Sequence, residues 1–348
     1  MVVDVSVIIP IHNGEKWINS CMKSIARQSI LKTRLIEIEI VVYNDGSNDR
    51  TEDILQLWAQ YFKRRRINFL VTGAKITKGV GAAKNGAVRL SSGTFLCFQD
   101  VDDLMHQDRI LLQWNFAKLN VNTLVGSKIT RNPLNSTPRF VHWANTINDT
   151  QLKNQIYLSY GPTILMPTWF CHRSVFENVG GFDETGKGTP EDLIFFYAHI
   201  DRGGTLHRVD KELVNYTYHA CATTFTISKK VIQSIQLQRL EGNVLLHWKQ
   251  FTVWNAGKNG RKFVRSLSLK NLNKVIGFCD VDKKKIGRTI ELYCPQQRKV
   301  KVKLPVVHFS EAKLPLIICV KLDLTNGEFE KNLKSLNLTE GKDYFLFG

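Results

Sequence analysis

The sequence predicts an α/β protein in two parts: a mostly parallel sheet flanked by helices over residues 1–225, and a smaller α/β domain over residues 249–348. Three observations lead to this prediction. Strand and helix patterns alternate at the start of the chain, polar residues follow three of the predicted strands, and a second strand–glycine turn–helix pattern begins near residue 251. With 348 residues, 43% of them hydrophobic, the chain is long enough for two cores.

The N-terminal part contains four apolar runs typical of strands buried on both faces: residues 3–10, 36–45, 67–73 and 94–100. Between them, apolar residues recur at helical spacing. They are Trp17, Ile18, Cys21, Met22 and Ile25 in one segment, and Ile54, Leu55, Trp58, Tyr61 and Phe62 in the next. Residues 78–90 (KGVGAAKNGAVRL) form a glycine-rich entry to a third helix. This alternation predicts a parallel sheet with ligands at the carboxyl ends of its strands.

Polar and acidic residues gather where these strands end. The first strand leads into Pro10-Ile11-His12-Asn13, the second into Asn44-Asp45-Gly46-Ser47, and the fourth into Asp100-Val101-Asp102-Asp103. Aspartates packed this closely repel one another unless water screens them or a cation lies among them. A solvated loop accounts for any one of these segments, but it accounts poorly for three at one edge of a sheet.

The residue types at this edge suit a nucleoside diphosphate and a hard cation. Asp100 and Asp102 are predicted to hold Mg²⁺ or Mn²⁺ against a diphosphate. Asp45 is predicted to accept a hydrogen bond from a nucleobase N–H, and Lys84, near a helix start, to place a positive charge by phosphate. The residues that we assign to cofactor binding are Pro10, His12, Asn13, Asp45, Lys84, Asn85, Asp100 and Asp102.

These motifs carry a family resemblance. SVIIPIHN, NDGSND and KGVGAAKNGAVRLSSGTFLCFQDVDD, in this order, resemble the inverting family-two glycosyltransferases of the GT-A fold, and the similarity extends to about residue 220. The resemblance implies a nucleotide-sugar domain with a metal-binding D-x-D motif. The segment GGFDETGKGTPED resembles the acceptor side of this family. It implies that Asp192 is the catalytic base, whereas a charge effect at a helix N-terminus is the structural alternative.

The implied chemistry is a single displacement with inversion at the sugar, and no covalent enzyme nucleophile is needed. His219 in YTYHACATT matches a histidine that joins the metal or diphosphate site in many members of the family. Thr217 stands where those members carry arginine, so a histidine held by local packing is an equal alternative to a metal ligand. The predicted metal ligands are therefore Asp102 and His219.

Nearly the whole chain also resembles one group in this family, the queuosine-tRNA galactosyltransferases. The segments that carry this similarity are GPTILMPTWFC, GTPEDLIFFY, WNAGKNGR and ICVKLDLTNGEFE. It implies UDP-galactose as donor and queuosine in the anticodon of tyrosine tRNA as acceptor. Trp143, Tyr160 and Trp169 are candidates for stacking on the anticodon base, with burial in the core as the alternative. Two other functions stay open: a cytosolic UDP-N-acetylglucosamine transferase acting on protein or glycan, and a non-catalytic tRNA-binding module.

The charge of the chain favours a polyanionic partner. There are 48 Lys and Arg against 31 Asp and Glu, a net charge of +17. Residues 249–348 hold 20 basic and 9 acidic residues, a surplus of +11. Basic runs occur at residues 63–66, 283–285 and 298–303. Nucleic acid is the first partner that this distribution predicts.

A connecting helix is expected over residues 226–248, followed by a Rossmann-like domain. There, WNAGKNGR resembles a dinucleotide-binding fingerprint, with Asp280 and Asp282 about 20 residues beyond it. The fingerprint is incomplete, because Asn255 occupies the first glycine position and only Gly257 and Gly260 remain. A bound dinucleotide is one reading, and a basic surface that binds RNA is the favoured one.

The location of the chain is predicted to be cytoplasmic. The N-terminus MVVDVSVIIP lacks the basic segment of a signal peptide, and no apolar stretch reaches the ~20 residues needed to cross a membrane. The seven cysteines form no CxxC pair, so neither a zinc site nor a disulfide framework is indicated. No membrane partner is expected, and the sequence does not determine the oligomeric state.

Overall fold

The computed structural model describes residues 2–33, 35–294 and 299–348. The chain forms two compact units. Unit 1 comprises the residues up to Leu152 together with Gly161–Ser228, and unit 2 comprises Lys153–Tyr160 and Lys229–Gly348. Arg298, the first residue of the basic run 298–303, lies outside the described ranges.

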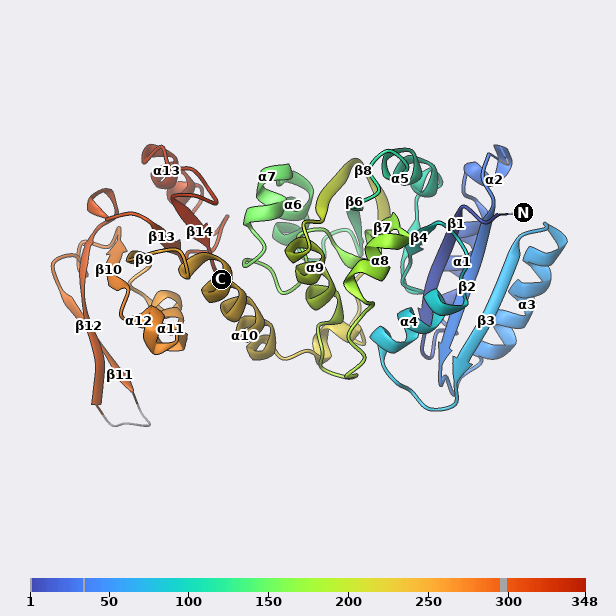
Figure 1. Cartoon of the computed structure of the whole chain (residues 1–348), viewed down its shortest axis with the longest axis horizontal. Coiled ribbons are helices and arrows are strands. Elements are labelled where there is room, and N and C mark those ends of the chain that lie inside the picture. Colours follow the sequence, from blue (N-terminus) through green and yellow to red (C-terminus); the bar gives the residue numbers. More distant parts are fainter. Residues whose placement is uncertain (1, 34, 295–298) are drawn as a thin grey trace. The chain divides into compact units, whose positions relative to one another are not determined.

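Unit 1 is built on an eight-stranded sheet in the order β3-β2-β1-β4-β7-β6-β8-β5 (Figure 1). The strands are β1 (Val5–Ile11), β2 (Ile38–Asp45), β3 (Asn68–Ala74), β4 (Phe95–Phe98), β5 (Leu104–Met105), β6 (Thr123–Asn132), β7 (Phe170–His172) and β8 (Thr205–Thr217). Strands β3, β2, β1 and β4 are parallel neighbours, as are β6 and β8. The pairings β4–β7, β6–β7 and β5–β8 are antiparallel. The predicted, mostly parallel sheet is confirmed.

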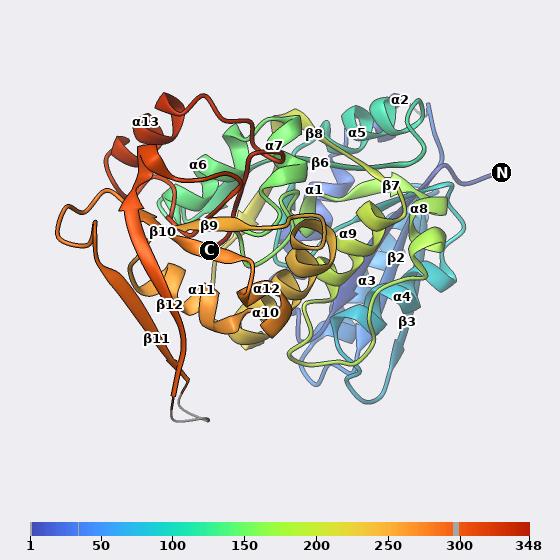
Figure 2. The same cartoon turned by 60° about the vertical axis from the view of Figure 1, so that its left-hand side comes forward.

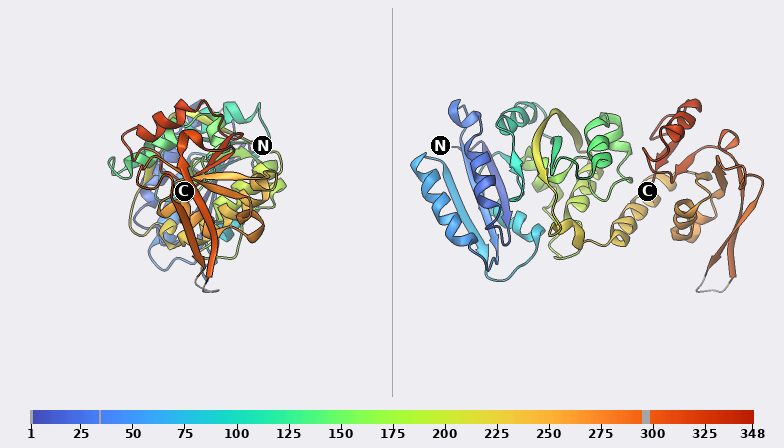
Figure 3. Two further views of the ribbon diagram at one scale, coloured as in Figure 1. Left: turned by 90° about the vertical axis from the view of Figure 1, so that its left-hand side faces the viewer. Right: turned by 180° about the vertical axis from the view of Figure 1, so that it is seen from behind.

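Helices cover both faces of this sheet. They are α1 (Ile18–Ala26), α2 (Ile30–Thr33), α3 (Thr51–Arg64), α4 (Val80–Leu90), α5 (Arg109–Ala117), α6 (Pro138–Thr146), α7 (Asp149–Asn154), α8 (Arg173–Val179) and α9 (Glu191–Asp201), with 3-10 turns η1 (Met166–Thr168) and η2 (Thr223–Thr226). The apolar faces of α1 and α3 share one core with alternate residues of β1 and β2 (Figure 3, right view, blue). This is the face that the helical spacing of the sequence predicts.

Helix α4 packs against β1 and β2, and its glycines allow the close approach. A Cβ atom on Gly86 would lie 2.2 Å from the ring of Tyr43 in β2, so any larger residue would push the helix away. Because α4 lies this close to the sheet, its inward side chains are buried, and Lys84 is only 2% exposed. The glycine-rich sequence of α4 thus places a lysine inside the protein.

Unit 2 contains a six-stranded sheet in the order β11-β12-β10-β9-β13-β14. Its strands are β9 (Phe251–Trp254), β10 (Val275–Asp280), β11 (Thr289–Cys294), β12 (Lys299–His308), β13 (Leu316–Ile318) and β14 (Tyr344–Leu346). Strands β12, β10, β9, β13 and β14 are parallel neighbours, and β11 pairs antiparallel with β12 in a hairpin (Figure 2). The expected second α/β domain is present, with the strand order of a doubly wound sheet around β9.

The helices of unit 2 are α10 (Lys229–Leu240), the π-helical turn η3 (Glu241–Leu245), α11 (Lys258–Ser266), α12 (Leu269–Leu272), the 3-10 turn η4 (Phe309–Glu311) and α13 (Glu328–Ser335). Helix α10 and η3 together occupy the segment in which the sequence predicts a helix. Among the residues that the structure describes, no helix is both long and apolar enough to span a bilayer.

Candidate functional site

The carboxyl ends of β1, β2 and β4 meet at one edge of the unit 1 sheet. Ile11 at the end of β1 lies opposite Asn44 of β2, and Ile8 of β1 lies opposite Phe98, the last residue of β4. The loops that begin at His12, Asp45 and Asp100 therefore leave the sheet side by side, as the alternating pattern predicts. Pro10 lies within β1, buried opposite Tyr43, so it shapes the strand end and offers no polar side chain.

Hydrogen bonds join the first two loops. The His12 Nδ1 atom lies 2.8 Å from the Asp45 carbonyl oxygen, and the Asn13 backbone N–H donates to Ser47 Oγ at 2.9 Å. Asn13 adopts a positive φ of 51°, a conformation that asparagine tolerates, and its Oδ1 accepts from the Asn48 N–H. Both side chains are exposed at the rim.

Asp45 is buried and binds the chain's own backbone. Its Oδ1 accepts from the Lys78 N–H and its Oδ2 from the Gly79 N–H, each at 2.8 Å. The carboxylate thereby fixes the entry to α4. A nucleobase N–H would have to use the remaining lone pairs of these two oxygens.

The three aspartates after β4 form one cluster. Asp100, Asp102 and Asp103 each offer a carboxylate oxygen, and these oxygens lie within 4.8 Å of one another. Asp103 is fully buried, and its Oδ2 has no hydrogen-bond partner in the described part of the chain. Its Oδ1 accepts from the Thr217 N–H at 2.8 Å, so Thr217 anchors the cluster to the end of β8.

His219 lies beside this cluster, as the sequence suggests. Its Nε2 is 2.7 Å from Asp102 Oδ2, and its ring is 5.1 Å from the ring of Trp17. The two side chains can share a proton, or both can turn lone pairs to one cation. The role of His219 as a metal ligand stays a prediction.

The cluster fits a hard divalent cation. All of its donors are carboxylate oxygens apart from the imidazole nitrogen, and Asp103 offers a buried oxygen that no other described residue hydrogen-bonds. Burial raises the pKa of Asp100 to about 6; Lys84 lowers it, and repulsion from Asp102 raises it. Burial and the same repulsion raise the pKa of Asp103. Such repulsion is what a bound cation relieves.

Lys84 extends this charge network to the first turn of α9, the predicted acceptor side. Its Nζ lies 2.8 Å from Glu191 Oε1, and both side chains are buried. Burial lowers the pKa of Lys84, but the negative charges of Glu191, Asp100 and Asp192 outweigh this effect and raise it. Lys84 thus lies among carboxylates from both predicted half-sites.

Asn85 has a different position from its neighbour. Its Nδ2 donates to the Phe182 carbonyl and to Glu184 Oε1, and its Oδ1 accepts from the Phe182 N–H. These bonds use both donors of the amide and hold the turn before α9. The cofactor contact predicted for Asn85 would have to be made by the remaining lone pair of Oδ1.

Asp192 lies in the first turn of α9, next to Glu191. Burial raises its pKa to about 7; Glu191 raises it further, and Lys84 lowers it. A carboxyl with this pKa can accept a proton near neutral pH, as a general base must. The charge effect of a helix N-terminus would lower this pKa, whereas burial and Glu191 act in the opposite direction. The role of Asp192 as the base stays a prediction.

Sequence reasoning did not identify Arg109, which positions the aspartate loop. This fully buried side chain donates from Nη1 to Gln99 Oε1 and from Nη2 to the Phe98 carbonyl. Gln99 Nε2 in turn donates to the carbonyls of Asp100 and Asp103. The signal was present in RILLQW, where Arg109 and Gln113 share one face of an otherwise apolar helix, and they hydrogen-bond there.

The predicted stacking residues require one correction. Trp169 is 0% exposed and packs against Phe195 in the core, so it is unavailable to a base and that prediction is wrong. Trp143 is half-buried in α6, and Tyr160 is 42% exposed, with Lys229 over its ring. The sequence analysis did not identify two exposed aromatic residues that are close to His219 in the sequence, Tyr218 and Phe225. Their ring centroids lie 5.7 Å apart.

The fold and this edge of the sheet define a GT-A glycosyltransferase. Residues 6–180, just over half of the chain, match glycosyl transferase family 2, and the chain belongs to this family. The poly(ribitol-phosphate) β-glucosyltransferase of Bacillus spizizenii is 30% identical over 125 residues, which cover 36% of this chain and 19% of that protein. An uncharacterised glycosyltransferase of Rickettsia bellii is 29% identical over 234 residues, 66% of this chain and 31% of its own length.

Among solved structures, TarS 1–349 of S. aureus in complex with UDP-GlcNAc superposes with a TM-score of 0.53 at 19% identity, covering 78% of each chain. This similarity shows the shared fold. The chain spans less than a third of the length of the two relatives above.

Proposed function

We propose that this chain is an inverting glycosyltransferase that uses a UDP-sugar and a divalent cation, Mn²⁺ or Mg²⁺. The observation that carries the proposal is the charge network of unit 1. In it, Lys84 forms a buried ion pair with Glu191, the neighbour of Asp192, and the charges of Asp192 and of Asp100 in the acidic cluster both act on Lys84. Donor and acceptor chemistry need this proximity, because the attacking oxygen and the leaving diphosphate lie on opposite sides of one carbon.

In the proposed reaction, Asp192 takes the proton of an acceptor hydroxyl. The oxygen forms a bond to the anomeric carbon, the bond from that carbon to the diphosphate breaks, and the configuration inverts. Asp100, Asp102, Asp103 and His219 would hold the divalent cation, which when bound neutralises negative charge on the departing UDP. Asp45 fixes the entry to α4, and Lys84 supplies a positive charge between the two half-sites.

We further propose UDP-galactose as the donor and queuosine in tyrosine tRNA as the acceptor. The resemblance of nearly the whole chain to the queuosine-tRNA galactosyltransferases supports this, and so does the net charge of +17. The exposed rings of Tyr218 and Phe225 support it too, since RNA bases taken out of a helix stack on aromatic side chains.

A second candidate is transfer of N-acetylglucosamine to a glycan or protein. The TarS complex with UDP-GlcNAc favours it. A non-catalytic tRNA-binding module is the third, and it predicts tRNA binding that is indifferent to UDP, Mn²⁺ and Asp192.

One experiment separates the three. The full chain is incubated with Mn²⁺ and labelled UDP-galactose or UDP-GlcNAc. The acceptor is tyrosine tRNA with queuosine, tyrosine tRNA without queuosine, or a glycan or protein. Label from UDP-galactose on queuosine-bearing tRNA alone is the expected result. Label from UDP-GlcNAc on a glycan or protein would support the second candidate, and tRNA binding without any transfer would support the third.

A further inference from the structure

The sheet of unit 2 has a place where doubly wound folds bind ligands. Its strand order changes direction at β9, which lies between β10 and β13. In such sheets a dinucleotide lies outside the carboxyl ends of the strands at this point, with its diphosphate on the backbone N–H groups of the first glycine-rich turn. Here that turn is residues 255–260 (NAGKNG).

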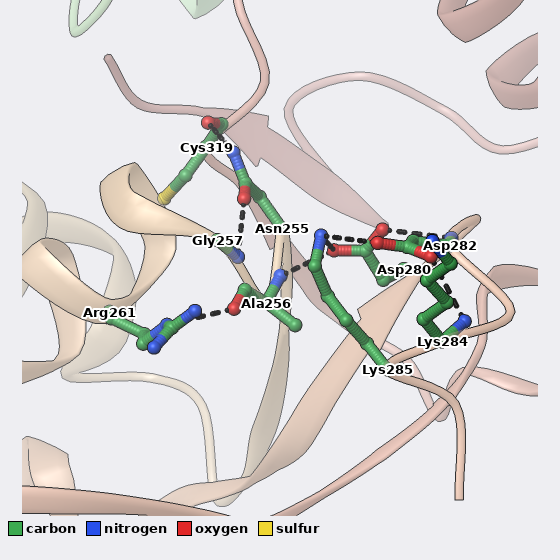
Figure 4. A network of polar contacts seen from close by, with 9 residues as sticks. All are labelled: Asn255, Ala256, Gly257, Arg261, Asp280, Asp282, Lys284, Lys285 and Cys319. Atoms are coloured by element: carbon green, nitrogen blue, oxygen red, sulfur yellow. Dashed lines mark hydrogen bonds and ion pairs between the residues drawn. The ribbon is translucent and has the colours of Figure 1, made fainter. Parts of the chain in front are cut away.

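The turn is closed by its own first residue. Asn255 takes the place of a glycine and adopts a positive φ of 110°, a conformation that side chains rarely adopt. Its Oδ1 accepts from the Gly257 N–H at 2.7 Å, and its Nδ2 donates to the Cys319 carbonyl at 2.9 Å (Figure 4). The side chain therefore links the end of β9 to the residue after β13 and occupies an N–H that a diphosphate would need.

Asp280, the acidic residue that would bind a ribose in a dinucleotide site, already has hydrogen-bond partners within the protein. Asp280, at the end of β10, is 7% exposed. Its Oδ2 accepts from the Ala256 N–H at 2.9 Å and lies 3.2 Å from Lys285 Nζ, while its Oδ1 accepts from the Asp282 N–H (Figure 4). The fold implies a dinucleotide, but the residues at this place do not fit one.

The remaining fingerprint glycine has a packing role. A Cβ atom on Gly260 would lie 1.9 Å from the Asn255 carbonyl oxygen, so only glycine lets α11 approach β9 this closely. Gly260 thus has a structural role that needs no bound dinucleotide.

Helix α11 presents a basic face. Lys258, Lys262 and Arg265 are exposed and recur at the spacing of one helical face. The opposite face, with Gly260, Phe263 and Val264, is buried. The segment KNGRKFVRS contains no acidic residue, and the described residues place no carboxylate within ion-pair distance of these three side chains. We call Lys258, Lys262 and Arg265 the α11 basic face.

We propose that unit 2 binds the phosphodiester backbone of RNA along the α11 basic face and holds no dinucleotide in the crevice at Asn255. The three positive groups span about 10 Å along the helix, which matches several consecutive phosphates. A membrane is a poorer partner, because an interfacial helix inserts apolar side chains and those of α11 are buried in the protein. That the RNA is a transfer RNA rests on the proposed function.

The test compares two variants of the full chain. One is K258Q/K262Q/R265Q. The matched control is K321Q/K331Q/K334Q, which removes three exposed lysines elsewhere in unit 2. Binding of labelled tRNA without queuosine is measured by fluorescence anisotropy across a series of salt concentrations.

We expect the α11 variant to lose about tenfold or more in affinity at about 100 mM salt, and its salt slope to fall by about 2 to 3. The control should change by less than about twofold. Equal losses in both variants, or no loss in the α11 variant, would overturn the proposal.

Three further measurements keep this result separate from the proposed function. Slow hydrolysis of UDP-sugar without acceptor should be equal in both variants, which shows that unit 1 is intact. Binding of NADH to the wild-type chain, followed by its fluorescence, would overturn the closed crevice. If the α11 variant binds phosphatidylserine vesicles more weakly than the wild type but binds RNA equally well, the partner of the α11 basic face is a membrane and the proposal is overturned. If the chain transfers no sugar from UDP-galactose but the α11 variant still binds RNA more weakly than the wild type, only the proposed donor is refuted.

Discussion

Lys84 and Glu191 form a buried ion pair, with 2.8 Å between Nζ and Oε1. The two residues come from α4 and from the first turn of α9, and they are 2% and 6% exposed. A buried charge without its partner is costly, so each residue constrains the other. The pair therefore links α4 to α9, the helix that carries Asp192.

Removing one partner of this pair should destabilise unit 1 strongly. Lys84→Met leaves Glu191 buried and unpaired, and we expect a loss of about 3–5 kcal/mol in the free energy of unfolding. The double variant Lys84→Met/Glu191→Leu should recover much of this loss, because it removes both charges. Urea unfolding followed by circular dichroism measures the three variants, and additive losses in the double variant would contradict a direct coupling.

The rate should depend on pH through Asp192. Burial and Glu191 raise the pKa of this carboxyl to about 7, and a general base must be ionised to act. We expect log kcat/KM to fall by one unit per pH unit below about pH 7. Lys84 lowers this pKa, so a folded Lys84→Met variant should show the acid limb at higher pH. A flat profile between pH 5 and 8 would exclude Asp192 as the base.

The ionised carboxylate of Asp192 should also destabilise the folded state at neutral pH. The folded state raises its pKa above the ordinary value of 3.8, so folding favours the protonated form. The contribution of the Asp192 carboxyl to the free energy of unfolding is therefore fully present below the pKa of the unfolded chain. It is lost as the pH rises through the folded-state pKa of about 7. Asp192→Asn should therefore raise Tm by a few degrees at pH 8 and much less at pH 4, while kcat falls by about 10²-fold or more. Differential scanning fluorimetry at the two pH values measures the first effect.

Most of the donor edge could be predicted from the sequence, because the apolar period identifies β1, β2 and β4 and their last residues can be read directly. Parallel pairing then requires Asp45 and Asp100 to lie at one edge. The partners of these side chains could not be read in this way. Asp45 binds the Lys78 and Gly79 N–H groups across 33 and 34 residues, and Lys84 meets Glu191 across 107.

The aromatic residues show a different limit. Trp169 and Tyr218 both stand near polar residues in the sequence, but the first is 0% exposed and the second 41%. Exposure of a ring depends on tertiary contacts such as that of Trp169 with Phe195 of α9, which no local pattern contains. The basic surplus was visible as composition, whereas its alignment on one face of α11 requires the helix to be placed against β9.

The acidic cluster should bind a divalent cation independently of turnover. We expect Asp102→Ala to weaken Mn²⁺ binding and to abolish sugar transfer, since it removes one of three clustered carboxylates and the partner of His219. Electron paramagnetic resonance of free Mn²⁺ in a titration gives the affinity directly. The affinity for tRNA should stay nearly intact, and a fully active Asp102→Ala enzyme would refute the metal assignment.

The exposed rings of Tyr218 and Phe225 should contribute to acceptor binding. Both follow β8 near His219, and their ring centroids lie 5.7 Å apart in an edge-to-face arrangement. Stacking of a base on one such ring contributes about 1–3 kcal/mol, so Tyr218→Ala or Phe225→Ala should raise KM for tRNA about 5- to 100-fold. We expect the KM for the UDP-sugar to stay unchanged. Leu119→Ala, at an exposed apolar residue after α5, is the control. An unchanged KM for tRNA in both aromatic variants would place the acceptor base elsewhere on unit 1.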